Sequence, residues 1–103
     1  MCSKVNSRRI LVVGAGLSGA VVARELADKG HQVTVIDKRN HIAGNVFDYI
    51  NEHGIRIHKY GPHLFHTKNK NVFMWLSRFT EWLPYKHKVK AILDNGRLVT
   101  LPV

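Results

Sequence analysis

Three glycines and one aspartate have the spacing of a turn that holds a diphosphate and an acid that holds a ribose. The segment "GAGLSG" gives a G-x-G-x-x-G pattern with Gly14, Gly16 and Gly19, and Asp37 follows Gly14 by 23 residues. The first glycine of such a turn permits a tight bend, the second lets a pyrophosphate approach the backbone, and the third lets a helix pack closely. An acidic side chain at this distance accepts hydrogen bonds from an adenosine ribose and disfavours a 2′-phosphate. The pattern predicts a dinucleotide site in which NADP is the weaker candidate; a glycine-rich turn without a ligand is the alternative.

A second candidate site is the segment "YGPHLFHTKNK", in which His63 and His66 lie three residues apart after a Gly-Pro pair. Together with His58 they form an H-x4-H-x2-H pattern, so a metal site is one interpretation. Zinc sites use firmer spacings, and neither a cysteine nor a carboxylate lies within the block, so we favour no metal. Two interpretations remain for these histidines, contact with a cofactor or a structural role, and His66 in particular could brace Thr67 and the next helix.

The glycine-rich turn requires a strand before it and a helix after it. Ile10 to Val13 is a short β-branched run closed by glycine, which is typical of a strand buried on both faces. An apolar helical stripe runs from Leu17 to Lys29, Gly30 is a suitable helix stop, and "HQVTVID" alternates as a second strand. Strand, helix and strand within about 30 residues predict a βαβ unit with parallel strands and a right-handed crossover.

Three further elements are expected downstream. Residues 46–61 could form two extended pieces around a turn at Asn51–Gly54. The apolar spacing from Asn69 to Leu83 predicts an amphipathic helix that Pro84 ends, with its aromatic side chains packed rather than offered for stacking. Two strand-like runs flank Asn95-Gly96, a dipeptide that favours a type I′ hairpin turn.

The composition limits the classes of protein. A chain of 103 residues is at most one small domain, and its apolar share of 45% predicts a real core. The net charge of +9 invites an anionic partner or reflects a solvated surface. Cys2 is the only thiol, so no internal disulfide is possible. We see no signal peptide and no apolar run of the roughly 18 residues that span a bilayer, so a cytoplasmic protein without membrane insertion is expected.

Longer stretches resemble known families. "GAGLSGAVVARELADKGHQVTVIDKRNHIAGN" is similar to the opening of flavin-dependent oxidoreductases and amine-oxidase-like proteins. Those families carry a glycine pair where this chain has Ala43-Gly44, a departure that matters only if the first position has positive φ. In order and spacing, "KRNHIAGN", "IHKYGPHLFHT", "PYKHKVKA" and the closing "LP" resemble the start of the UDP-galactopyranose mutase family. The resemblance runs from about Ile10 to the last residue.

The resemblance implies a fold and a set of contacts. The fold would be α/β, a Rossmann-like βαβ dinucleotide-binding unit with an added helix and a C-terminal β-hairpin. Residues 1–103 would be the N-terminal part of a single FAD-binding domain in a longer protein. His63 would be a modulator of the flavin ring, and His87 would touch the UDP-sugar. The implied cofactor contacts are Gly14, Gly16, Leu17, Ser18, Gly19, Asp37, Lys38, Gly44, Asn45, His63 and Leu64.

The implied activity is the interconversion of UDP-galactopyranose and UDP-galactofuranose, in which reduced FAD supplies the nucleophile. The product would feed galactofuranose-containing polysaccharides such as cell wall or O-antigen. The 103 residues are expected to show no turnover by themselves, and the full-length protein could be a homo-oligomer. Two other classes stay open: the start of another FAD-dependent oxidoreductase of the amine-oxidase-like group, and a small basic nucleic-acid-binding module. We favour no nucleic-acid partner, because nothing in the chain resembles a recognition helix or a stacking sheet.

Overall fold

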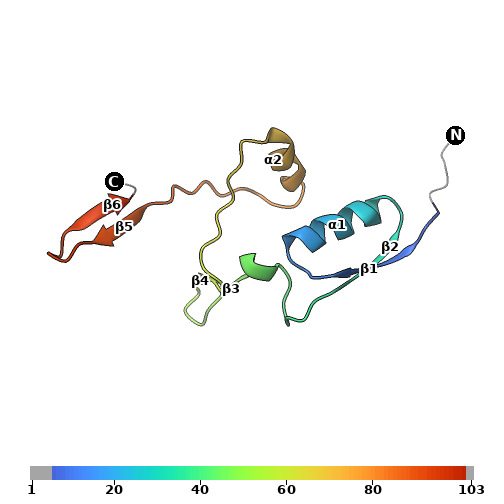
Figure 1. Cartoon of the computed structure of the whole chain (residues 1–103), viewed down its shortest axis with the longest axis horizontal. Coiled ribbons are helices and arrows are strands. Elements are labelled where there is room, and N and C mark those ends of the chain that lie inside the picture. Colours follow the sequence, from blue (N-terminus) through green and yellow to red (C-terminus); the bar gives the residue numbers. More distant parts are fainter. Residues whose placement is uncertain (1–5, 102–103) are drawn as a thin grey trace. The chain divides into compact units, whose positions relative to one another are not determined.

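The computed structural model describes residues 6–101, so Cys2 and the end of the closing "LP" motif lie outside the described residues. The elements follow one another as β1, α1, β2, the short 3-10 turn η1, β3, β4, α2, β5 and β6 (Figure 1). The chain divides into two compact units between Phe65 and His66. Within residues 6–101 no helix has the length and apolar character needed to cross a membrane.

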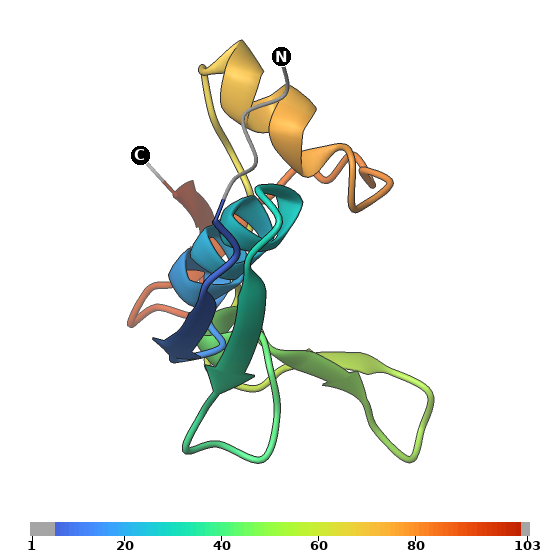
Figure 2. The same cartoon turned by 90° about the vertical axis from the view of Figure 1, so that its right-hand side faces the viewer.

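The first unit opens with the expected βαβ arrangement, so the chain has a Rossmann-like α/β fold. Strand β1 (Arg9–Val13) pairs in parallel with β2 (Gln32–Ile36), and helix α1 (Leu17–Asp28) connects them and packs on the pair (Figure 2). The helix ends where the sequence indicates, because Gly30 has φ 86° and donates its amide to the Ala27 carbonyl at 2.9 Å. A glycine in the left-handed region is a common way to close a helix.

The expectation that β1 is buried on both faces is wrong for this chain. Ile10 and Val12 are half-buried, whereas Leu11 and Val13 are 59% and 76% exposed. Ile36, the partner of Val13 in the register, is also exposed. Parallel strands are buried on both faces only when a layer covers each face, and the described residues place a helix on one face alone.

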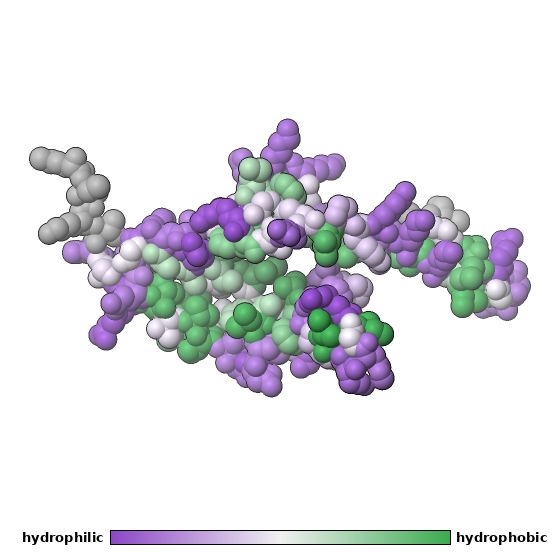
Figure 3. Space-filling model, turned by 180° about the vertical axis from the view of Figure 1, so that it is seen from behind, coloured by the Kyte–Doolittle hydropathy of each residue, from purple (hydrophilic) through white to green (hydrophobic). Residues whose placement is uncertain are grey.

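The expected core is likewise absent from the described residues. None of the apolar side chains among residues 6–101 is buried, and many large ones are exposed. Apolar residues are visible over the surface in Figure 3. The apolar share of 45% would allow a core, but residues 6–101 do not bury apolar side chains to form one.

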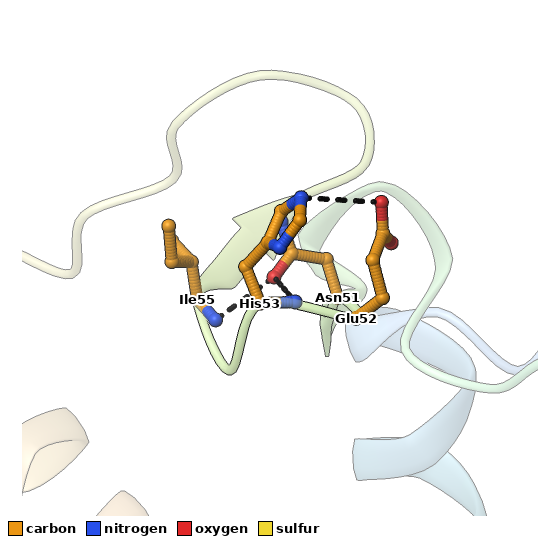
Figure 4. A network of polar contacts seen from close by, with 4 residues as sticks. All are labelled: Asn51, Glu52, His53 and Ile55. Carbon is orange, nitrogen blue, oxygen red and sulfur yellow. Dashed lines mark hydrogen bonds and ion pairs between the residues drawn. The ribbon is translucent and has the colours of Figure 1, made fainter.

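A short hairpin follows the βαβ unit, as the two extended pieces predicted. Strands β3 (Asp48–Ile50) and β4 (Arg56–His58) pair antiparallel, with an Arg56–Asp48 ion pair of 2.6 Å. In the turn, the Asn51 side-chain oxygen accepts the amides of His53 and Ile55 at 3.0 and 2.9 Å (Figure 4). This Asx-type arrangement lets one asparagine side chain satisfy two backbone donors of the turn.

In the second unit, helix α2 is shorter than predicted. It runs from Lys70 to Leu76, and Asn69 caps it by accepting the amides of Asn71 and Val72 at 2.9 and 3.3 Å. Trp82 stacks on Phe73 with ring centres 5.3 Å apart. In a continuous helix these residues would be separated by about 13.5 Å along the axis at 1.5 Å per residue. The chain therefore leaves the helix and turns back, so the predicted extension to Leu83 is wrong.

The C-terminal hairpin is present, but its turn differs from the predicted type. Strands β5 (Val89–Ile92) and β6 (Leu98–Leu101) pair antiparallel. A type I′ turn on Asn95-Gly96 requires positive φ at both residues. Gly96 meets this requirement with φ 79°. Asn95 does not, because Ala43 is the one non-glycine residue with positive φ among residues 6–101. Leu93 donates its amide to the Arg97 carbonyl at 2.9 Å. The loop is therefore the three-residue kind in which a left-handed glycine follows a turn.

Candidate dinucleotide-binding site

The three glycines of the turn after β1 are in three different situations. Gly14 has φ 107°, a backbone conformation that side chains disfavour, and its amide donates to the Ile36 carbonyl at 2.7 Å. A Cβ on Gly19 would overlap the Gly14 carbonyl oxygen, so the helix lies too close to the turn for a side chain. A Cβ on Gly16 would meet the Gly44 Cα at 3.8 Å, an ordinary contact. The fold thus explains Gly14 and Gly19, and leaves Gly16 to be explained by something that approaches from outside.

The start of α1 offers backbone donors next to this turn. Gly16 is the N-cap residue and provides no side-chain cap, and Ala20 donates the first helical hydrogen bond, to the Gly16 carbonyl, at 2.9 Å. The amides of Leu17, Ser18 and Gly19 precede that bond and lie in the first turn. The first turn of a helix leaves such N–H groups without helical partners and carries the positive end of the dipole. An anion placed here would be stabilised by both.

The carboxylate of Asp37 binds the backbone on both sides of the turn. Its Oδ1 accepts the amide of Arg39 at 2.8 Å and its Oδ2 accepts the amide of Ala15 at 2.7 Å. These two hydrogen bonds, that of Arg39 first, lower the pKa of Asp37 below its usual value of 3.8, with smaller contributions from the charges of Arg39 and His41. A carboxylate has about four acceptor positions, so each oxygen can still accept a hydroxyl.

A loop after β2 closes the site from the other side. Ala43 donates its amide to the Ala15 carbonyl at 2.8 Å and has φ 73°, so the position at which the resembled families carry glycine does require a left-handed backbone. A Cβ on Gly44 would lie 2.9 Å from the Gly16 Cα, closer than folded proteins allow. The two glycine-bearing turns therefore touch backbone to backbone.

These segments surround an open cavity of about 680 Å³. This volume lies within the roughly 300–1,000 Å³ typical of small-molecule sites. The cavity lies at the carboxyl ends of two parallel strands, where open α/β sheets bind their ligands. The walls are Val13, Gly14, Gly16, Ile36, Asp37, Lys38, Arg39, Gly44 and Asn45.

Five of the predicted cofactor contacts are not on the wall of this cavity: Leu17, Ser18 and Gly19 lie in the first turn of α1, and the others are His63 and Leu64 further along the chain. His63 and Leu64 are exposed, and His63 contacts the Gly61 carbonyl through Nδ1 at 2.8 Å. Their segment is nevertheless attached to the cavity loop, because the hydroxyl of Tyr60 contacts Nε2 of His41 at 2.8 Å. Sequence reasoning missed His41 and Arg39, and the only signal was their position between Asp37 and Ala43.

Two further histidine candidates lie in the second unit. His66 is exposed, and His87 is exposed beside Tyr85 with ring centres 5.9 Å apart. Within residues 6–101, no group of three or more histidine, cysteine, aspartate or glutamate side chains converges as metal ligands would. His58, the first histidine of the H-x4-H-x2-H pattern, lies in β4 and is half-buried.

Comparisons with known proteins agree with this geometry. A family model described as an NAD(P)-binding Rossmann-like domain matches residues 12–79, more than half of the chain. The chain is 43% identical over 100 residues to a protein named probable UDP-galactopyranose mutase from Klebsiella pneumoniae, covering 96% of the chain and 26% of that relative. It is 42% identical over 96 residues to dTDP-fucopyranose mutase of Escherichia coli, covering 92% of the chain and 25% of that relative.

A more distant likeness points to the oxidases. The chain is 36% identical over 74 residues to an L-amino acid oxidase of Bothrops pictus, covering 72% of the chain and 15% of that relative. The chain thus spans about a quarter of the length of the mutases it matches. The resemblance to UDP-galactopyranose mutases that the motifs indicated is confirmed.

Proposed function

The chain belongs to the NAD(P)-binding Rossmann-like domain family, and we propose that its cavity binds the adenosine diphosphate part of FAD in a UDP-galactopyranose mutase. The single observation that carries the binding proposal is Gly16. This glycine has φ −76° and a Cβ there would make only an ordinary contact with Gly44, yet it lines the cavity beside the first turn of a helix. A ligand that touches the backbone would account for a glycine at this position.

The first turn of α1 and the side chain of Asp37 have separate roles in this proposal. The first-turn amides of Leu17, Ser18 and Gly19 would receive the diphosphate, because they combine unpaired donors with the positive end of the helix dipole. Asp37 would accept the ribose hydroxyls on the acceptor positions that its two backbone bonds leave available. Its negative charge would repel a 2′-phosphate, which favours FAD or NAD over NADP.

The remaining predicted contacts extend the site outward. Lys38, Gly44 and Asn45 lie on the cavity wall and would contact the cofactor there. His63 and Leu64 would approach the flavin ring from the segment that Tyr60 attaches to the cavity loop. His87 would contact the nucleotide part of the substrate. We further propose that residues 1–103 are the N-terminal part of a longer FAD-binding domain, since the related mutases are about four times as long.

The proposed reaction converts UDP-galactopyranose into UDP-galactofuranose. Reduced flavin, when bound, would supply the nucleophile for the anomeric carbon and so permit ring contraction without net redox change. The contribution of this chain is to bind and orient the cofactor. A second mutase relative acts on a dTDP-sugar by its name, so the broader substrate class is a nucleoside diphosphate hexopyranose.

A calorimetric titration tests the binding proposal. We expect ADP and FAD to bind, ADP with an added 2′-phosphate to bind more weakly, and Gly16→Ala to weaken both while the protein stays folded. Gly19→Ala is the matched control, because its Cβ would overlap the Gly14 carbonyl oxygen and so disturbs the fold itself. Unchanged ADP affinity in folded Gly16→Ala contradicts the proposal.

The mutase proposal needs its own assay. Purified protein that continues this sequence should form UDP-galactofuranose from UDP-galactopyranose with reduced FAD, and the 103 residues alone should not. Conversion by the 103 residues would refute the proposal that they are only part of the catalytic domain.

One alternative has a specific observation in its favour. The likeness to an L-amino acid oxidase covers 72% of the chain, so the same FAD-binding unit could open an amine-oxidase-like oxidoreductase. An oxidase would reduce its flavin with an amino acid or amine and would leave UDP-galactopyranose unchanged. The two assays therefore separate the candidates.

A further inference from the structure

His41 lies at the centre of a cluster that joins two segments of the first unit. Its ring stacks on Phe47 with centres 4.0 Å apart and an interplanar angle of 17°. Its Nδ1 contacts the carbonyl oxygen of Ile42 at 2.8 Å, and its Nε2 contacts the hydroxyl of Tyr60 at 2.8 Å. The imidazole therefore connects the loop that follows Asp37 to the first residue of the segment that carries His63.

The two polar contacts assign the proton on the neutral ring. A carbonyl oxygen can only accept, so the Nδ1 of His41 carries the hydrogen and its Nε2 accepts the hydrogen of the Tyr60 hydroxyl. When both nitrogens are protonated, Nε2 donates to the hydroxyl oxygen instead. The contact between the two segments is thus compatible with either charge state of the ring.

Tyr60 carries this connection on to the cavity wall. The guanidinium of Arg39 lies 4.5 Å from the centre of the Tyr60 ring, and the ammonium of Lys59 lies 5.7 Å from it. Arg39 lines the cavity, and its amide binds the carboxylate of Asp37. The place of the Tyr60 ring therefore affects both the cavity wall and the start of the segment 60–64.

We propose that His41 and Tyr60 form a tether that holds the segment 60–64 against the cavity loop, and that His41 is a positioning residue for the dinucleotide. The proposal rests on the proposed function, because it takes the ligand of the cavity to be FAD. His41 touches no reacting atom in it. The His41 ring acts through Tyr60, which fixes the position of Arg39 and the start of the segment that carries His63.

Two substitutions at one position separate the tether from simple packing. The amide of glutamine reaches the place of Nε2, so His41→Gln keeps an acceptor for Tyr60. The amide of asparagine reaches the place of Nδ1, so His41→Asn keeps the contact to Ile42 and loses the tether. Tyr60→Phe removes only the hydroxyl and leaves the ring under Arg39.

Matched controls come from the β3–β4 hairpin, which lies between His41 and Tyr60 in the sequence. His53→Asn changes an exposed histidine that pairs with Glu52 at 3.6 Å in the turn of Figure 4. Tyr49→Phe removes a hydroxyl from a ring that contacts Phe47 rather than His41. Both controls should behave as wild type in the two measurements, NMR of the ring and segment and the affinity for FAD.

The first measurement needs no cofactor. Proton–nitrogen NMR correlations of the His41 ring should show the Nδ1-protonated tautomer, and Tyr60→Phe should shift the Nε2 resonance. Backbone relaxation should show greater nanosecond motion of residues 61–64 in His41→Asn and Tyr60→Phe than in wild type or His41→Gln. A neutral ring protonated at Nε2 alone, or motion unchanged by loss of the hydroxyl, overturns the tether.

The second measurement is the affinity for FAD, followed by quenching of flavin fluorescence. His41→Asn and Tyr60→Phe should each weaken binding roughly two- to tenfold, the range expected for one neutral hydrogen bond. The double variant should be no weaker than either single one, because both remove the same interaction. His41→Gln should bind within about twofold of wild type.

The outcomes separate this inference from the proposed function. If wild type binds FAD and His41→Gln, His41→Asn and Tyr60→Phe all bind it as tightly as wild type, the positioning role is overturned while the cofactor proposal stands. The same holds if His41→Gln and His41→Asn weaken FAD binding equally. If wild type binds no FAD, the proposed function is refuted and the positioning role with it. In that case the NMR measurement still decides whether the tether exists.

Discussion

Replacement of Ala43 by glycine should stabilise the protein. Ala43 has φ 73°, and it is the one non-glycine residue with positive φ among residues 6–101. Its amide donates to the Ala15 carbonyl at 2.8 Å, a bond that does not involve the side chain. Ala43→Gly therefore removes a strained conformation and leaves the link between the two turns in place.

The size of the effect follows from two opposing terms. The left-handed region costs an alanine about 1–2 kcal/mol. Glycine in turn loses more backbone freedom on folding, a cost of roughly 0.5–1 kcal/mol. The difference is a gain of about 0.5–1 kcal/mol in the free energy of unfolding, or a rise of about 2–8 °C in Tm for a small domain.

Thermal unfolding followed by far-UV circular dichroism, with FAD present at a fixed concentration, measures this gain. Ala20→Gly is the matched control, since Ala20 is exposed in α1 and has ordinary helical φ. There the same substitution should lower the free energy of unfolding by about 1 kcal/mol. The reasoning is refuted if Ala43→Gly lowers the Tm, or leaves it unchanged while Ala20→Gly lowers it.

Three other changes have definite expected results. Gly19→Ala should cost about 1–3 kcal/mol, because helix and turn must separate to fit the Cβ, and urea unfolding beside Gly16→Ala measures it. The lowered pKa of Asp37 means that its ionised form stabilises the turn fully above pH 3.8, and this stabilisation is lost as pH falls through the lower pKa of the folded state. Asp37→Asn should therefore lack this pH-dependent part of the stability when unfolding is followed against acid pH. Equal acid-unfolding profiles for wild type and Asp37→Asn would contradict the reasoning. Asn69→Ala should lower the stability of α2 by about 1 kcal/mol through loss of its cap, seen as faster amide exchange in residues 71–74, whereas Asn69→Ser should retain protection.

Local sequence patterns predicted the βαβ unit well. The strand before Gly14, the helix from Leu17 and its end before Gly30 each depend on residues close together in the chain. The spacing of Asp37 also predicted its place at the cavity, because the length of a βαβ unit fixes where the second strand ends. The two backbone amides that Asp37 accepts were not predicted, since a motif specifies the residue and not its geometry.

The errors arose where contacts between distant residues decide the structure. The apolar period continues from Asn69 to Leu83, but Trp82 also donates its indole N–H to the Ser77 hydroxyl at 2.7 Å, which fixes the chain reversal after α2. Asn95-Gly96 suits more than one hairpin loop, and the hydrogen bond from Leu93 to Arg97 selects the longer one. The contact between His41 and Tyr60 joins residues 19 apart in the chain, beyond the reach of any periodicity.

The open face of the β1–β2 pair bears on how the protein behaves when concentrated. This face exposes the apolar side chains of Leu11, Val13 and Ile36 to water. The backbone groups at the edges of the strands can form hydrogen bonds with another extended chain. Molecules that meet through such faces associate in proportion to their concentration, and heating strengthens rather than weakens that attraction over ordinary laboratory temperatures. Scattering and spectroscopy on this chain will therefore describe single molecules in cold, dilute solution and clusters in warm, crowded ones.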